Sequence, residues 1–268
     1  MSVLHINNIT NKEGTSGPVI AGIATVSSTS HMVVPTGNTG TRYATLKNDP
    51  YYEFLELALP FSQDTEFFDV TGNFGDPRKI GDVTISSAQS KFYTKSVLFD
   101  GTGDGLQYGG TKKGFGTGDF TIECWIYRNS IGTTDSIIVD YYLNSTPTNN
   151  DIQFYITNGN KLSWFYDQEG AGYAEVGTTT INASTWYHVA VTRKNGIVQG
   201  WLNGTLEFTD NNGRVASLPL GIPTRGWWVG IDANDSAEPF HGHIQDLRVY
   251  NGVAKYTSNF TPPNQIAL

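Results

Sequence analysis

Residues 120–127 read FTIECWIY, so that every second side chain from Phe120 onward is apolar. Successive side chains of a β-strand point to opposite faces of the sheet, and this spacing predicts a strand with one face in a hydrophobic core. Glu123, Trp125 and Tyr127 fall on the opposite face. The pattern therefore favours a β fold, and it leaves two aromatic side chains to be explained.

Turn sequences separate further β-type runs along the rest of the chain. Asn-Gly pairs at 158–159, 195–196 and 203–204 each lie between two such runs, which is the strongest short-range signal for a β-hairpin. Roughly a dozen short strands without a helical stripe predict an all-β sandwich. The clearest are expected at 120–127, 136–142, 151–157, 161–167, 186–193, 197–202, 205–208, 227–231 and 244–250.

The first 42 residues contain none of the 6 Trp, 14 Tyr and 14 Phe of the chain. Aromatic residues dominate core energetics, so this segment cannot supply much of a core. We expect an extended N-terminal docking arm, residues 1–50, before a β-sandwich domain, residues 51–268. The arm would gain order on a partner through Val19, Ile20, Ile23, Val26, Val33 and Val34. The alternative is a strand pair that covers one edge of the sandwich.

The charge balance and the single cysteine exclude several classes of protein. The chain has 25 acidic and 17 basic residues and no basic run, which argues against nucleic-acid binding. It has no apolar stretch approaching 18 residues, so we expect no membrane span, and no secretory signal is recognisable. Cys124 cannot form an intrachain disulfide, which fits synthesis in a reducing cytoplasm.

Five segments follow one another in a distinctive order: SVLFDGTGDGL at 96–106, GDFTIECWI at 118–126, WYHVAVTR at 186–193, LNG at 202–204 and GHIQDLRVY at 242–250. From about Tyr51 to Leu268 this series resembles the laminin-G-like domain. The resemblance implies an all-β, concanavalin A-like jelly-roll β-sandwich.

The flanking segments resemble a narrower group. FDVTGN at 68–73, SAQSKF at 87–92 and AKYTSNFTPP at 254–263 are similar to the version found in structural proteins of tailed phages. GTSGPVIAGI at 14–23 is similar to N-terminal segments in virion proteins of phages that infect marine cyanobacteria. The resemblance implies a virion protein of capsid-decoration or tail type, made in the host bacterial cytoplasm. Its partners would be other virion proteins and further copies of itself.

Laminin-G-like domains often hold one calcium ion at the rim, and Asp140, Asp232 and Asp235 lie where its ligands would fall. Calcium prefers oxygen ligands. The alternative is that these side chains cap turns, as Asp commonly does. Asp100 and Asp104 form a second acidic group. His241 and His243 share a strand face, but no third ligand lies near them in the sequence, so we expect ordinary packed or surface histidines.

Concanavalin A-like hydrolases use a Glu-x-Asp-x-Glu strand, which this chain lacks. We therefore expect no enzymatic activity and no catalytic residues. Trp125 and Tyr127, with Asn144 and Asn149 from a loop, are candidate glycan-binding residues, although most aromatics of a sandwich are core. The predicted protein docks by its arm and faces its jelly roll outward, to stabilise the particle or to bind host glycans. The alternative is a free carbohydrate-binding module with a calcium-dependent, lectin-like site.

Overall fold

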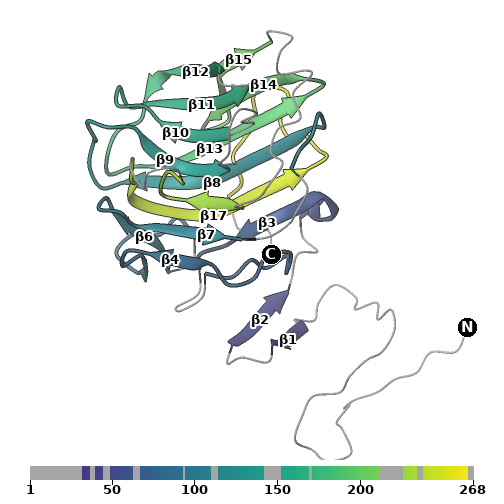
Figure 1. Ribbon diagram of the computed structural model, residues 1–268, viewed down its shortest axis with the longest axis vertical. Helices are drawn as coiled ribbons and strands as arrows, with labels where there is room; N and C mark the ends of the chain where they lie inside the picture. The colour runs from purple at the N-terminus through teal and green to yellow at the C-terminus, as the bar shows by residue number, and fades with distance from the viewer. Residues whose placement is uncertain are drawn as a thin grey trace, which may run out of the picture.

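The computed structural model describes residues 32–36, 40–44, 49–62, 67–92, 94–109, 114–141, 152–168, 171–211, 226–233 and 238–264. Two antiparallel sheets pack face to face as a sandwich (Figure 1), as the sequence predicts. A 3₁₀ helix, Tyr52–Phe54, leads into the first strand of the sandwich. No helix among these residues has the length and apolarity needed to cross a bilayer.

In each sheet, the order of the strands in space differs from their order along the chain. From one edge to the other, the seven-stranded sheet consists of β12 (Ala171–Thr180), β11 (Lys161–Gln168), β10 (Ile152–Ile156), β9 (Ser136–Tyr141), β16 (Trp227–Val229), β7 (Gly105–Tyr108) and β4 (Arg78–Ile80). The eight-stranded sheet consists of β15 (Thr205–Asp210), β14 (Ile197–Leu202), β13 (Trp186–Lys194), β8 (Phe120–Arg128), β17 (His241–Asn251), β6 (Ser96–Asp100) and β5 (Thr84–Ser86), with β3 (Leu55–Leu59) also paired to β17.

Strand β8 confirms the alternation predicted from the sequence. Phe120, Ile122, Cys124 and Ile126 belong to the core between the sheets, whereas Trp125 packs outside it, against Phe92 and His188. Because β8 lies between β13 and β17, two rows of side chains cross the outer face of the eight-stranded sheet. One row is His188–Trp125–Gln245 and the other is Trp186–Tyr127–His243. These rows position the candidate site.

The predicted hairpins are present. β13 and β14 are joined by Asn195-Gly196, and β14 and β15 by Asn203-Gly204. All four residues have positive φ, between 48° and 79°, as two-residue hairpin loops of type I′ require. None of the strands expected from the sequence covers residues 171–180, which form β12 and pair with β11. This edge strand is rich in small and polar residues, so it lacks the hydrophobic run expected of a central strand.

The opening segment is described only in part. Strands β1 (Met32–Thr36) and β2 (Gly40–Ala44) pair with each other and belong to neither sheet of the sandwich. These two strands belong to the expected arm, and β1 contains Val33 and Val34. The other expected docking residues, Val19, Ile20, Ile23 and Val26, lie outside the described residues. Docking of the arm stays a prediction.

Candidate functional site

An open groove of about 590 Å³ lies on the outer face of the eight-stranded sheet. Its floor comes from β8 and β13, and its walls come from the loop after β5, the β14–β15 turn and the C-terminal segment. The residues that line it are Lys91, Phe92, Trp125, Trp186, Asn203, Pro262, Pro263 and Asn264. A concave site with several aromatic walls and a few polar groups is the usual form of a small-ligand site.

Trp125 forms the floor of the groove. Its ring packs edge-on against Phe92 at 5.7 Å and against His188 at 5.3 Å between centroids. The ammonium of Lys91 lies 4.1 Å from the centre of the ring. Trp125 is only 6% exposed, and its buried indole N–H has no hydrogen-bond partner among the described residues. The predicted position of Trp125 on the outer face is confirmed. Because Trp125 is nearly buried, an aromatic ring face that a ligand can reach must come from a neighbouring residue.

Trp186 and Tyr127 supply that surface. They are cross-strand partners on β13 and β8, and both are half-buried. Their rings lie 5.6 Å apart and are tilted by 50°. Trp186 lines the groove, and Tyr127 supports it from the adjacent strand. Alternation in β8 predicted Tyr127, but no pattern in the sequence singled out Trp186 from the other tryptophans.

The loop that carries Lys91 and Phe92 is held by one buried amide. The Gln245 side-chain oxygen accepts hydrogen bonds from the backbone N–H groups of Lys91 (2.9 Å) and Phe92 (2.8 Å). Its NH₂ group donates to the carbonyls of Phe92 (2.9 Å) and Lys95. This uses the full hydrogen-bonding capacity of the amide. Gln245 is fully buried and lies opposite Trp125, so the loop is fixed to the floor of the groove.

The opposite wall is fixed by the Asn203-Gly204 turn. The Asn203 side-chain oxygen accepts the backbone N–H of His188 at 2.9 Å. Gly204 accepts a hydrogen bond from the backbone N–H of Phe260 at 2.9 Å, and the rings of Phe260 and Tyr256 are stacked with centroids 3.5 Å apart. These contacts hold the C-terminal segment against the sheet and so position Pro262 to Asn264.

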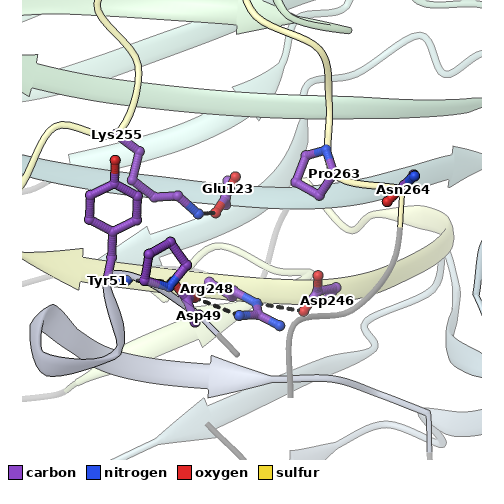
Figure 2. A pocket seen from close by; sticks show the side chains of 9 residues that line it. Asp49, Tyr51, Glu123, Asp246, Arg248, Lys255, Pro263 and Asn264 are labelled. Carbon is purple, nitrogen blue, oxygen red and sulfur yellow. Dashed lines mark hydrogen bonds and ion pairs between the residues drawn. The ribbon is translucent and has the colours of Figure 1, made fainter. Parts of the chain in front are cut away.

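A second cavity of about 210 Å³ shares Pro263 and Asn264 with the groove, and Figure 2 shows its charged walls. Arg248 lies between Asp49 and Asp246, with a nitrogen–oxygen distance of 2.7 Å to each. Lys255 pairs with Glu123 on the other side of the cavity. These five charged residues come from the segment before β3, from β8, from β17 and from the segment after it. The ion pairs therefore tie the two ends of the domain to one sheet.

The charged groups of this cavity neutralise one another in ion pairs. Burial alone would raise the pKa of Glu123, but Lys255 and His188 hold that pKa well below its usual value. Burial raises the pKa of Asp246, although Arg248 acts in the opposite direction. Asp49, which the predicted boundary assigns to the arm, is buried and contacts both Arg248 and Tyr250. The network fits a structural role better than acid–base chemistry.

The predicted calcium ligands lie partly within the structure. Asp140 is fully buried, and one of its oxygens accepts the backbone N–H of Ala233 at 2.9 Å. Gln153, the cross-strand partner of Asp140, has its side-chain nitrogen 3.5 Å from Asp232, so the structure brings both aspartates to one region. Asp235, like the candidate glycan residues Asn144 and Asn149, lies outside the described residues. The hydrogen bond from Ala233 is the kind of contact expected if Asp140 caps a turn, which is the alternative to a calcium site. Calcium binding stays a prediction.

Carboxylate oxygens of Asp82, Asp100 and Asp104 lie within 4.8 Å of one another and form a candidate acidic cluster for a cation. Asp104 already accepts the backbone N–H groups of Asp82 (2.8 Å) and Asp100 (2.9 Å). Burial, and to a smaller extent the charge of Asp100, raises the pKa of Asp104. The oxygens have the chemistry that a hard cation prefers, yet the bonds of Asp104 also hold the turn between strands.

The histidines have separate polar partners. His243 shares a hydrogen bond with Ser96 at 2.9 Å, and His241 shares one with Ser130 at 2.8 Å. Burial lowers the pKa of His243 to about 4. His188 is only 1% exposed, because the C-terminal segment covers it. Its Nε2 lies 3.2 Å from Glu123.

The two antiparallel sheets define a concanavalin A-like β-sandwich domain. Residues 100–255 match the model of the concanavalin A-like lectin/glucanases superfamily, and the chain belongs to this family. No curated protein sequence matches the chain.

Solved structures agree on the fold. Domain 4 of an extracellular arabinanase from Geobacillus stearothermophilus, in complex with arabinotriose, is 19% identical with a TM-score of 0.57, covering 74% of this chain and 92% of that one. The binding domain of botulinum neurotoxin serotype D is 15% identical with a TM-score of 0.54, covering 75% of this chain and 49% of that one. A sialidase from Trypanosoma rangeli is 16% identical with a TM-score of 0.52, covering 75% and 31%. At these identities the likeness concerns the fold alone.

Proposed function

We propose that this protein is a non-enzymatic glycan-binding domain that acts as a structural component of a phage particle. The observation that carries the binding role is the aromatic groove on the outer face of the eight-stranded sheet. Sugar rings stack their C–H faces on aromatic rings, and Trp186 and Phe92 are half-buried and line the groove. The side chains of Asn203 and Asn264 supply polar groups for hydroxyls.

The lining of the groove supports binding rather than hydrolysis. Glycosidases of the common type need two carboxyl groups beside the scissile bond, and none of the described residues that line this groove carries a carboxylate. Glu123 lies in the adjacent cavity, where it is bound by Lys255, His188 and Tyr256. Such a carboxylate is not free to protonate a leaving group. The arabinanase domain, solved with arabinotriose, supports glycan as the ligand class.

A comparison of two aromatic variants tests the binding role. The wild type should be retained by at least one of a set of soluble polysaccharides in affinity electrophoresis, and W186A should weaken retention at least tenfold, which corresponds to about 1.4 kcal/mol. The matched control is Y52A, because Tyr52 is 46% exposed and does not line the groove. Equal binding by W186A and the wild type would place the ligand elsewhere and refute the proposal.

The particle role is supported by the sequence resemblance of residues 68–73, 87–92 and 254–263 to tailed-phage structural proteins. The separate β1–β2 hairpin is compatible with an attachment segment. Many copies on a particle would turn weak individual contacts into firm attachment to a host cell. A chain lacking residues 1–42 should keep the thermal unfolding of the sandwich but fail to co-sediment with particles. Normal incorporation of this truncated chain would contradict the docking role.

A further inference from the structure

We propose that the groove selects acidic glycans, those with carboxylate or sulfate groups, and that Lys91 is the residue that determines this specificity. The inference rests on the proposed function, because it concerns the same groove. It goes further in naming the class of glycan and the side chain that distinguishes an acidic sugar from a neutral one.

The groove carries a positive charge in an acidic protein. Among the described residues that line it, Lys91 alone is titratable. The whole chain has 25 acidic and 17 basic residues. The lining of the groove has the opposite sign, because it carries a cation and no carboxylate. The buried carboxylate of Glu123, in the adjacent cavity, is already matched by Lys255. An anionic ligand group would therefore meet a positive charge without a competing negative one.

The ammonium of Lys91 is available to a ligand. In the described part of the chain, no carboxylate lies within ion-pair distance of it, whereas Lys194, Lys255 and Arg248 are all paired. Lys91 is exposed and rests over the ring of Trp125 at 4.1 Å. A cation–π contact leaves the ammonium's N–H groups that face away from the ring free to donate. A compact charge with three donors suits a carboxylate or a sulfate.

Lys91 is also ordered before any ligand binds. Its backbone is fixed by the buried amide of Gln245, and its ammonium lies over the indole ring of Trp125. An ordinary surface lysine loses much side-chain freedom when it pairs, which is why exposed ion pairs contribute little. Here a large share of that ordering precedes binding, so a ligand charge gains more from the contact. The position of the ammonium above the floor of the groove places it beside a sugar bound there.

Matched polysaccharides test the inference. Isothermal titration would compare polygalacturonate with its methyl ester, and dextran sulfate with dextran, so that the carboxylate and sulfate arms are measured separately. For at least one acidic polymer, the wild type should bind at least tenfold more tightly than to its neutral counterpart. K91Q should lose most of this difference.

Lys79 provides the control, because its ammonium also lies over an aromatic ring, Phe67 at 4.7 Å, but outside the groove. K79Q should leave the preference intact. Equal binding of acidic and neutral polymers, or an equal loss in K79Q and K91Q, overturns the inference. If neutral polymers bind in a Trp186-dependent manner without an acidic preference, the proposed function survives and this inference fails. If no polysaccharide binds, both fail.

Discussion

Replacing Arg248 by Met should destabilise the sandwich severely. Arg248 is 3% exposed and holds two carboxylates, Asp49 and Asp246, which are 2% and 7% exposed. In R248M both carboxylates lose their cation without gaining water. Removing one partner of a buried ion pair typically costs about 3–5 kcal/mol, which for a domain of this size lowers the melting temperature by roughly 6–20 °C.

The measurement is urea unfolding followed by tryptophan fluorescence, with K194M as the control. Lys194 pairs with Asp119 at 2.6 Å, but its side chain is 49% exposed, so its loss should cost less than about 1 kcal/mol. If R248M and K194M lose the same small amount, the network does not hold the ends of the domain to the sheet, and the structural interpretation of the cavity is wrong.

A third variant separates charge from packing. Combining R248M with D49N and D246N removes all three charges together, and it should recover much of the lost stability, because the penalty comes from uncompensated carboxylates. Lower pH should also recover part of the stability that R248M loses, because protonation removes the charge of a carboxylate. The pKa of Asp246 is already raised by burial, and without Arg248 it rises further, so the deficit of R248M should shrink between pH 7 and pH 5. A deficit that is unchanged in the triple variant and at pH 5 would assign the loss to packing instead.

Two further predictions concern groups around the groove. Burial lowers the pKa of His243 from 6.5 to about 4, so the unfolded chain takes up this proton first. Stability should fall as the pH drops from about 6.5 to about 4, and urea unfolding of H243Q across this range should show a smaller decrease; identical pH profiles would contradict this origin. G204A should cost roughly 2–5 kcal/mol and weaken glycan binding, because Gly204 has φ +78° and an added Cβ would collide with the Phe260 carbonyl oxygen. G103A, with φ +74° but nothing within 4 Å, should cost only about 1–2 kcal/mol in the same unfolding assay, and equal losses would show that the close approach does not matter.

Local patterns predicted the fold because they are strong where the sheet is regular. The alternation of β8 assigned the core face correctly, and the Asn-Gly pairs located two turns whose positive φ values require such residues. Trp227 and Trp228 also fall on opposite faces, as neighbours in a strand must. Trp228 is nevertheless buried, under Ile80, Ile231 and Ala233. Which outer-face residues are covered depends on how other segments fold over the sheet, and alternation carries no information about them.

The groove was only partly predictable for the same reason. Trp125 and Tyr127 follow from alternation, but Lys91 and Phe92 belong to a loop that Gln245 holds across 153 or more positions in the sequence. Asn203 and Pro262 reach the same site from a turn and from the C-terminal segment. All four residues lie in segments that the sequence analysis singled out, but nothing in those segments shows that they meet at one site. Gln245, a polar residue next to Ile244 in the strand expected at 244–250, was a signal that could have drawn attention to this side of the sheet.

Strand β17 shows how a single irregularity creates the candidate site. Regular alternation would place Gln245 and Arg248 on opposite faces, since they are an odd number of residues apart. Asp246 has φ +52°, and the register with β8 shifts between Gln245 and Arg248. A β-bulge of this kind re-aims the residues that follow it. Ile244 and Leu247 therefore both face the core, while Gln245 supports the groove and Arg248 holds the charged cavity beside it. One strand thus serves both sites on the same face, and straightening the bulge would move Arg248 into the core or Gln245 away from its loop.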